Sequence, residues 1–329
     1  MDQLHIGVIG CGKMANTLLK KCVSMGQRVV AVYDPDAEAV ARAREDYGAE
    51  AASSAEDLCR RADVNAVLVA SPPAYHIEGV LAAAAAGKPV YCEKPLATNV
   101  ADCDRMIRAC DEAGTPLFVG QVLRLFPLFW QSRVLIDAGR IGTPRAVRVT
   151  RTSFARFFGQ GWRSRRAEAG GLLLEIHVHE LDYMRFLLGE PVEVYARMDN
   201  LIGQMDYEDQ AFVIVTFENG AVGSLHASMS SPIGEYNVSI QGTGGNIVHG
   251  GFGGILRVQG VGGETEEYKP EDVGVPDAYD RELRSWIDSL TVGTEPIFTG
   301  ADGRACVAMA QAARLSADLN RPVAIAELG

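Results

Sequence analysis

The sequence predicts an α/β fold of two domains: a doubly wound parallel sheet in residues 1–122, and an α+β domain with an open, largely antiparallel sheet in residues 123–329. Three observations predict it. Short apolar runs alternate with helical patterns through the first third of the chain, and a glycine-rich turn joins the first run to the first helix. Beyond about Leu123, strand patterns follow one another through glycine-containing turns. The length of 329 residues is enough for two such domains.

The composition is that of an ordinary globular protein and argues against several kinds of partner. Hydrophobic residues make up 47% and charged residues 22% of the chain, and no apolar run reaches membrane-spanning length. The net charge of −11 argues against nucleic acids and anionic membranes as partners. The first residues do not have the pattern of a signal peptide. The seven cysteines are scattered and lack CxxC spacing, so we predict reduced thiols and a cytoplasmic location.

The glycine-rich turn predicts a dinucleotide site. The apolar run Leu4–Ile9 leads into Gly10-Cys11-Gly12-Lys13-Met14-Ala15 and then into a helical pattern. Strand, GxGxxA turn and helix in this order are typical of a Rossmann dinucleotide-binding unit. Gly10 permits the tight turn, Gly12 lets the backbone approach a pyrophosphate, and Ala15 keeps helix and strand close. With the phosphates at the helix N-terminus, the predicted cofactor-binding residues of the turn are Gly10, Gly12, Lys13 and Met14.

Asp34 predicts which dinucleotide is bound. It follows the second strand, Arg28–Tyr33, at about the distance expected for the ribose-binding acid. A carboxylate accepts hydrogen bonds from both ribose hydroxyls but repels a 2′-phosphate. The sequence therefore predicts NAD as the cofactor in preference to NADP.

Three further strands complete the predicted parallel sheet. They span Val64–Ala70, Pro89–Cys92 and Pro116–Gly120, and their nearly continuous apolar character is typical of strands covered on both faces. The helical patterns between them run from Ala74 to about Ala86 and from a cap at Asn99 or Asp102 to about Gly114. Ligands bind outside the carboxyl ends of such strands. Five further predicted cofactor-binding residues follow this edge: Ser71, His76, Glu93, Lys94 and Gln121.

Lys94 is the candidate for chemistry at this edge. A lysine at a buried strand end beside a cofactor can donate a hydrogen bond to a substrate oxygen and stabilise developing charge. An ion pair with Glu93 or a clamp on the pyrophosphate is the alternative. His76, near the start of a helix, is expected at the cofactor edge or in packing rather than in catalysis.

The second domain opens with a helix and continues mainly as strands. The opening helix begins at Leu125-Phe126-Pro127 and runs to about Gly139, and the last helix spans about Gly300 to Leu319. Residues 123–329 are predicted to bind the substrate and to mediate oligomerisation. An open sheet leaves one face to be covered, which favours a homodimer or homotetramer. The predicted strands are Arg145–Thr152, Val192–Arg197, Asp209–Phe217, Ala221–Ser228, Glu235–Gln241 and Ile255–Gln259.

The stretch Gly170–Asp182 predicts an acid–base site. Its apolar spacing, continuing to Leu188, suits one mostly buried helix with Glu175, His179 and Asp182 on one face. A carboxylate one turn from an imidazole can orient the ring, which is the usual arrangement of a general base. A buried polar cluster that only fixes helix packing is the alternative, and Asp182 is expected to be a structural anchor.

His177 does not fit this face. On a helix it lies roughly 200° from Glu175 and should point away from it. In an extended segment His177 and His179 would share a side, but spacing places no third ligand, so no metal site is predicted.

Seven arginines and no carboxylate lie between Arg145 and Arg166, which is unusual in so acidic a chain. They either bind an anionic group of the substrate or form a solvated face, and the second interpretation is preferred for Arg165 and Arg166. Trp162 beside Arg163 suits a polyhydroxylated ring, with its apolar face and hydroxyl rim. We therefore predict that these two residues line a substrate site.

The chain resembles the Gfo/Idh/MocA family of nicotinamide-dependent oxidoreductases (glucose-fructose oxidoreductase, inositol dehydrogenase and relatives) over nearly its whole length. The Glu-Lys-Pro and Gly-Gly…His-x-x-Asp elements are together fairly specific, whereas the glycine turn alone is not. The matching motifs are Gly10–Ala15, Ser71-Pro72-Pro73 with His76, Glu93-Lys94-Pro95, Arg124 with Phe126-Pro127, Gly161-Trp162-Arg163, and Gly170-Gly171 through His179 to Asp182.

The resemblance implies residue roles. The family's lysine at the position of Lys94 contacts substrate and nicotinamide, often before a cis proline, and the histidine matching His179 is the usual proton acceptor. An aspartate four residues earlier assists it, where this chain has Glu175. The chain also has His177 where many members have glycine. Arg124 is added to the predicted substrate-binding residues.

We predict an NAD(H)-dependent oxidoreductase acting on a secondary hydroxyl of a sugar, sugar derivative or cyclic polyol. Its predicted catalytic residues are Lys94, His179 and Glu175. Two alternatives stay open: an NAD-retaining, glycoside-cleaving enzyme of the same family, and a non-catalytic sugar- or dinucleotide-sensing protein.

Overall fold

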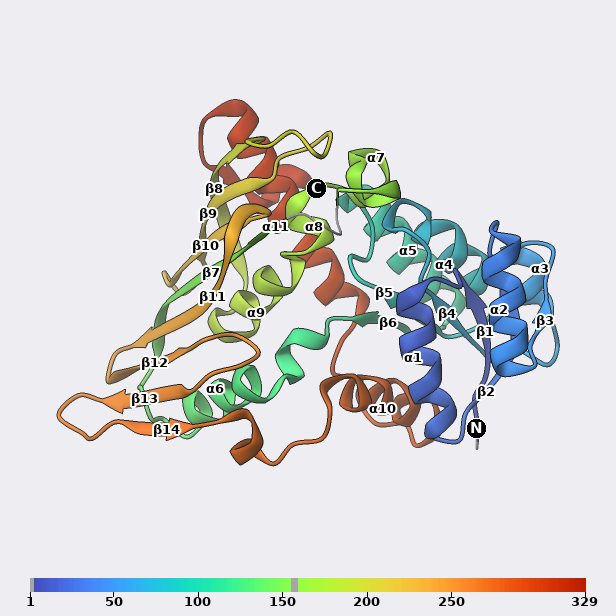
Figure 1. Ribbon diagram of the computed structural model, residues 1–329, viewed down its shortest axis with the longest axis horizontal. Helices are drawn as coiled ribbons and strands as arrows, with labels where there is room; N and C mark the ends of the chain where they lie inside the picture. The colour runs from blue at the N-terminus through green and yellow to red at the C-terminus, as the bar shows by residue number, and fades with distance from the viewer. Residues whose placement is uncertain (1–2, 155–158) are drawn as a thin grey trace. The chain divides into compact units, whose positions relative to one another are not determined.

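The computed structural model describes residues 3–154 and 159–329, which form two compact units (Figure 1). Unit 1 consists of the described residues up to 121 together with 279–307, and unit 2 of 122–278 and 308–329. The segment 279–307, which the sequence analysis assigned to the second domain, thus clusters with unit 1. The assignment of substrate binding and oligomerisation to residues 123–329 stays a prediction.

Unit 1 is built on a six-stranded parallel sheet with the order β3-β2-β1-β4-β5-β6. This is the doubly wound dinucleotide-binding order, in which the chain switches direction between β1 and β4. The predicted doubly wound parallel sheet is confirmed. The strands are β1 (His5–Ile9), β2 (Arg28–Tyr33), β3 (Glu50–Ala51), β4 (Ala66–Val69), β5 (Val90–Glu93) and β6 (Leu117–Gly120).

The helices of unit 1 follow the strands, and several begin at a side-chain cap. Asn99 caps α5, because its side chain accepts a hydrogen bond from the Asp102 backbone N–H. The helices are α1 (Lys13–Ser24), α2 (Ala37–Tyr47), α3 (Ala55–Arg60), the 3₁₀ turn η1 (Pro73–Tyr75), α4 (His76–Ala85), α5 (Val100–Ala113) and α10 (Ala278–Thr291). Helix α10 was not among the elements predicted from the sequence.

Unit 2 is built on a nine-stranded sheet with the order β14-β13-β12-β11-β7-β10-β9-β8-β15. Among the strand pairs of this sheet in the described residues, β7 and β10 alone are parallel, so the prediction of a largely antiparallel sheet is confirmed. Strands β12, β14 and β15 were not predicted from the sequence. The strands are β7 (Pro144–Phe154), β8 (Pro191–Asp199), β9 (Gln210–Phe217), β10 (Val222–Ser228), β11 (Ser230–Gly242), β12 (Gly245–His249), β13 (Leu256–Gly260), β14 (Glu266–Tyr268) and β15 (Val323–Ala324).

Helices cover one face of the nine-stranded sheet. Helix α9 contacts β7 and β10, and the short α8 contacts β9 and β10.

None of the helices in the described part of the chain could span a membrane. The remaining elements are η2 (Val122–Leu125), α6 (Pro127–Asp137), η3 (Gly161–Ser164), α7 (Arg166–Ala169), α8 (Leu172–Glu175), α9 (Val178–Leu188), η4 (Pro270–Val273), α11 (Gly300–Leu319), which enters unit 2 at Ala308, and η5 (Ile325–Leu328).

The prediction of one continuous helix from about Gly170 to Leu188 is wrong. Helix α8 ends at Glu175 and α9 begins at Val178, and Ile176 and His177 between them have non-helical backbone angles. The His177 carbonyl accepts hydrogen bonds from the backbone N–H groups of Glu180 and Leu181, which starts the second helix afresh. Glu175 and His179 therefore do not lie one turn apart on one helix.

Candidate functional site

The glycine turn of unit 1 has the geometry of a phosphate-binding turn. Gly10 has φ +91°, and a Cβ there would overlap the backbone of Ala70 and Ser71, so no other residue fits. Gly12 is the N-cap of α1 and makes no side-chain cap. A Cβ at Gly12 would meet no atom of the described residues within 4 Å, which leaves the helix N-terminus open to a ligand. Ala15 is fully buried, as expected of a residue that keeps the helix close to the sheet.

Asp34 lies at the end of β2 and holds the glycine turn. Its carboxylate accepts hydrogen bonds from the backbone N–H groups of Cys11, at 2.7 Å, and Asp36, at 2.8 Å. A carboxylate has about four acceptor positions, so these two contacts leave room for ribose hydroxyls. The predicted ribose contact of Asp34 stays a prediction.

Two polar side chains at the carboxyl ends of β4 and β6 support a bound ligand. Gln121 is fully buried, yet neither atom of its amide has a hydrogen-bond partner among the described residues. The Ser71 hydroxyl, also buried, lacks one within the same part of the chain. Unsatisfied buried polar groups are costly, and a ligand that supplies the missing donors and acceptors removes the cost. These residues therefore fit a dinucleotide at this strand edge.

His76 ties two loops of the same edge together. Its ring is almost fully buried, with Nδ1 2.9 Å from the Pro95 carbonyl oxygen and Nε2 2.8 Å from the Ser71 carbonyl oxygen. Burial lowers the pKa of His76, so the ring is neutral and donates to one carbonyl at a time. Contact with the cofactor stays a prediction for His76. The peptide bond between Lys94 and Pro95 is cis, as the resemblance implied.

Glu93 joins a buried hydrogen-bonded chain that the sequence did not predict. The Tyr91 hydroxyl lies 2.9 Å from Oε2 of Glu282, on α10, and 3.3 Å from Oε1 of Glu93. The second Glu93 oxygen accepts the Lys94 backbone N–H at 3.1 Å. Burial raises the pKa of Glu93 to about 7, against the opposing influence of the Lys94 charge. Because the helix that carries Glu282 was not predicted, no sequence pattern pointed to this contact.

In unit 2, Glu175 pairs with Arg163. The Arg163 Nε lies 2.7 Å from Glu175 Oε1, and its guanidinium lies over the Trp162 ring at 4.3 Å. The Arg163 carbonyl accepts the Tyr207 hydroxyl. Trp162 and Arg163 were predicted to lie together, whereas the predicted partner of Glu175 was His179 or a substrate hydroxyl. The structure brings three predicted site residues together and adds Tyr207, which the sequence analysis missed.

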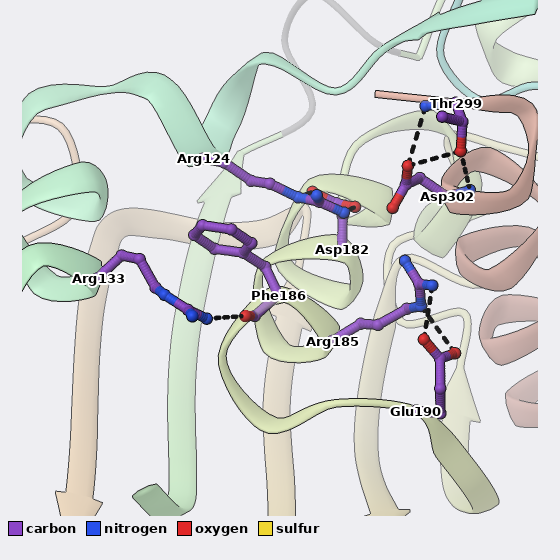
Figure 2. A network of polar contacts seen from close by, with 8 residues as sticks. All are labelled: Arg124, Arg133, Asp182, Arg185, Phe186, Glu190, Thr299 and Asp302. Carbon is purple, nitrogen blue, oxygen red and sulfur yellow. Dashed lines mark hydrogen bonds and ion pairs between the residues drawn. The ribbon is translucent and has the colours of Figure 1, made fainter. Parts of the chain in front are cut away.

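Arg124 and Asp182 form a buried, bidentate ion pair (Figure 2). The Arg124 guanidinium also lies 4.9 Å from the centroid of the Phe186 ring. The prediction that Asp182 is an anchor is consistent with this pair, whereas the predicted substrate contact of Arg124 stays a prediction. Arg133 of α6 donates a hydrogen bond to the backbone carbonyl of Phe186 in α9. This contact fixes the two helices to each other.

Glu180 is the centre of a buried network that sequence reasoning overlooked. Its Oε1 accepts hydrogen bonds from Arg151 of β7, at 2.8 Å, and from the Tyr236 hydroxyl of β11, at 2.6 Å. Its Oε2 lies 3.3 Å from Nδ1 of His177. Burial alone would raise the pKa of Glu180, but the Arg151 charge and the His177 ring hold it well below its usual value. The network fixes the first turn of α9, which carries His179.

The arginines between Arg145 and Arg166 mostly make contacts within the protein. Beyond Arg151 and Arg163, Arg165 pairs with Glu168, Arg166 with Glu208, and Arg145 donates to the Asn219 carbonyl. Arg148 lies at a groove of about 510 Å³ on the sheet, and Arg156 lies outside the described residues. Within the described ranges, no group of three or more His, Cys, Asp or Glu residues is placed to hold a metal ion.

Two family models match the chain. Residues 4–121 match the oxidoreductase family with an NAD-binding Rossmann fold, GFO_IDH_MocA, and residues 129–248 match the GFO/IDH/MocA C-terminal domain. Together they span both sheets up to residue 248, so that β13, β14 and β15 lie outside the matches.

Individual proteins show the same likeness over almost the whole chain. The myo-inositol 2-dehydrogenase of Thermotoga maritima is 29% identical, with 99% of each chain covered. The 1,5-anhydro-D-fructose reductase of Ensifer adhaerens is 32% identical over 90% of this chain and 91% of its own. An oxidoreductase from Agrobacterium radiobacter, crystallised with NAD⁺, L-tartaric acid and magnesium, has a TM-score of 0.89 at 26% identity, with 99% of each chain covered.

Proposed function

Because the chain belongs to the GFO/IDH/MocA family of oxidoreductases with an NAD-binding Rossmann domain, we propose that it transfers hydride between NAD and a secondary hydroxyl of a sugar, sugar derivative or cyclic polyol. The two relatives named as a myo-inositol dehydrogenase and an anhydrofructose reductase support this substrate class.

The observation that carries the proposal is the carboxyl edge of the six-stranded sheet. The open N-terminus of α1 suits a pyrophosphate. The buried amide of Gln121 lacks a hydrogen-bond partner among the described residues. It therefore suits a ligand with both a donor and an acceptor. The proposed cofactor-binding residues are Gly10, Gly12, Lys13, Met14, Asp34, Ser71, His76, Glu93, Lys94 and Gln121.

Three side chains share the proposed chemistry. Bound NAD supplies the hydride acceptor at nicotinamide C4. His179 removes the proton of the substrate hydroxyl, and Lys94 donates a hydrogen bond to the oxygen as negative charge develops on it. Glu175, held by Arg163, orients the base or binds a neighbouring hydroxyl. In the reverse direction His179 returns the proton to the carbonyl oxygen.

Substrate binding is assigned to Arg124, Trp162 and Arg163. The stacked Trp162 and Arg163 offer an apolar ring face and guanidinium donors side by side, which suits a ring with C–H faces and a rim of hydroxyls. Because Arg124 is already engaged by Asp182, its proposed contribution is to hold the wall of the substrate site.

The test is a panel of inositols, aldoses, aldonic acids and anhydrosugars mixed with NAD and followed by NADH absorbance. We expect net NADH with at least one class. Tightly retained cofactor, with substrate conversion but no net NADH, would favour the NAD-retaining glycoside-cleaving alternative. Cofactor binding with no reaction across the panel would favour the sensor.

We also propose that the protein is a cytoplasmic homodimer or homotetramer. All seven cysteines are free thiols, as in reducing compartments. The face of the nine-stranded sheet away from α9 carries exposed apolar side chains, including Phe212 and Ile214 of β9. A second copy of the chain would bury them.

A further inference from the structure

Tyr91 lies between two carboxyl groups inside unit 1. Its hydroxyl oxygen is 2.9 Å from Oε2 of Glu282 and 3.3 Å from Oε1 of Glu93. Tyr91 is fully buried, Glu282 is 1% exposed and Glu93 is 7% exposed, so water cannot screen the two carboxyl groups from each other. Glu93 directly precedes Lys94, to which the proposed function gives a catalytic role.

The number of available protons determines the protonation states of Glu93, Tyr91 and Glu282. The Tyr91 hydroxyl lies within donating distance of both carboxyl groups, but it carries one proton and can donate it fully to only one of them. The shorter contact assigns the phenolic proton to Glu282. The contact between Tyr91 and Glu93 then requires a proton on Glu93, because two ionised carboxylates on one buried hydroxyl would repel each other. The chain then runs from the Glu93 O–H to the Tyr91 oxygen, and from the Tyr91 O–H to the Glu282 carboxylate, with one net negative charge.

The surrounding residues are shaped to hold this arrangement. The Tyr91 ring stacks on Phe118 at 5.3 Å and meets the edge of Trp286 at 5.4 Å. Position 120 on β6 must be glycine, because a Cβ there would lie 2.5 Å from the Tyr91 hydroxyl oxygen and 3.2 Å from Glu93 Oε1. The site is thus built from β5, β6 and α10, segments far apart in the sequence.

We propose that Glu93 is held as a neutral carboxylic acid at neutral pH by the Tyr91–Glu282 pair, and that it thereby acts as a positioning residue for Lys94. A neutral Glu93 leaves the positive charge of Lys94 available to a developing oxyanion, whereas an ionised Glu93 would cancel part of it. Its other oxygen still accepts the Lys94 backbone N–H and fixes the start of the loop. The functional part of this inference rests on the proposed function.

Titratable and charged groups of two elements face Glu93. Tyr91 and Cys92 belong to its own strand, Lys94 follows that strand directly, and Glu282 comes from α10. Lys94 and the Tyr91 hydroxyl favour ionisation of Glu93, while burial opposes it and raises its pKa. A charged Glu282 at the same buried hydroxyl adds to this opposition, because like charges repel. Removing the Glu282 charge therefore makes Glu93 more acidic.

The test is infrared difference spectroscopy of the full-length protein during a pH titration. We expect a carbonyl stretching band of a protonated carboxylic acid at neutral pH, lost in Glu93→Gln and kept in Glu78→Gln. Glu78 is an exposed glutamate of α4 and is the matched control for an acid-to-amide change. In Glu282→Gln the midpoint of the band should fall by about one pH unit or more, since a neighbouring like charge is gone.

A second variant covers the case in which Glu282→Gln does not fold. Tyr91→Phe removes the acceptor of the Glu93 proton, so the band should move to higher frequency. Absence of a band sensitive to Glu93→Gln at neutral pH, or an unchanged midpoint in Glu282→Gln, would overturn the protonation state.

The positioning role is tested by enzyme kinetics in Glu282→Gln. Between the lowered midpoint and the wild-type midpoint we expect kcat to fall while the dissociation constant of NAD stays the same. An unchanged kcat in a variant whose band has disappeared would overturn the role toward Lys94. The band is measured without cofactor or substrate, so a failure of the proposed function would leave the spectroscopic result standing.

Discussion

At the scale of single residues, Lys94 and His179 carry the proposed chemistry. Lys94 follows β5 directly, and His179 is the second residue of α9. We expect Lys94→Ala and His179→Ala each to lower kcat by on the order of 10²- to 10⁴-fold, close to abolishing turnover, with NAD binding largely intact. Steady-state kinetics and calorimetric NAD titration measure the two effects. Lys20→Ala, on the exposed side of α1, is the matched control, and wild-type rates in either site variant would refute the mechanism.

Asp34 sets the expected choice of cofactor. Replacing it by Asn keeps its shape and an acceptor for the glycine turn but removes the negative charge. Loss of charged hydrogen bonds to the ribose should raise the KM for NAD by roughly tenfold, and relief of repulsion should improve the use of NADP. Competing KM measurements for both cofactors, with the exposed Asp46→Asn as control, test this. Unchanged discrimination in Asp34→Asn would show that Asp34 only supports the turn.

His249 should make unit 2 sensitive to acid. Its ring is buried edge-on against Phe129 at 4.8 Å, and burial lowers its pKa to about 4. Between pH 4 and its ordinary value of about 6.5, the unfolded chain binds a proton that the folded protein does not. The contribution of His249 to the free energy of unfolding is therefore fully present above this window. It is lost as the pH drops through the window, by an amount on the order of 3 kcal/mol.

The variant His249→Phe separates this contribution from the other titrating groups. Phe keeps an aromatic ring against Phe129 but cannot be protonated. Denaturant unfolding at several pH values between 4 and 6.5 should give a flatter pH dependence of the unfolding free energy in the variant. Parallel curves for the two proteins would contradict the assignment.

At the scale of elements, α9 is held in place by Glu180. The carboxylate joins the first turn of α9 to β7 through Arg151 and to β11 through Tyr236. Glu180→Gln removes a carboxylate that is almost fully buried and leaves the Arg151 side chain, which is 24% exposed, without its ionic partner, so we expect a loss of about 3 kcal/mol in the free energy of unfolding, measured with a chemical denaturant. Its effect on kcat should be large as well, because the same turn carries His179.

A matched control lies just after the same helix. Arg185 of α9 forms an ion pair with Glu190, whose side chain is 52% exposed (Figure 2). Glu190→Gln removes the same charge at the surface and should cost less than about 1 kcal/mol. Similar losses in Glu180→Gln and Glu190→Gln would mean that the buried network does not anchor the helix.

The same helix shows where element prediction from the sequence stops. The apolar spacing of residues 170–188 predicted helical structure correctly, but not the break at Ile176 and His177. The helix after the break is held by Glu180 and its partners on β7 and β11, and their pairing is set by the tertiary fold. Helix α10 was missed although Leu283, Trp286 and Ile287 have helical spacing, so a more systematic scan of the periodicity would have found it.

At the scale of the whole molecule, the sequence predicted one half of the candidate site better than the other. Parallel strands bring their carboxyl ends to one edge by geometry alone, so Ser71, Lys94 and Gln121 could be grouped without a structure. In unit 2, the pairing of Arg163 with Glu175 and of Arg124 with Asp182 joins separate elements. No periodicity encodes such pairs, which is why Arg163 was placed near the substrate but not beside Glu175.

The open face of the nine-stranded sheet leads to a prediction about assembly. On this face Phe212, Ile214 and Val222 are 51%, 47% and 41% exposed, and the Phe212 ring stacks on His226 at 4.2 Å. Neighbouring apolar side chains of this size on one surface are typical of an interface, and a second copy of the same face is the simplest partner.

We expect light scattering after size exclusion to give a dimer or tetramer for the wild type and a smaller species for the double variant Phe212→Asp/Ile214→Asp. Val261→Asp, at an apolar side chain that is 86% exposed in the turn after β13, is the control and should keep the wild-type mass. A monomeric wild type, or a double variant with unchanged mass, would leave this face without the proposed role.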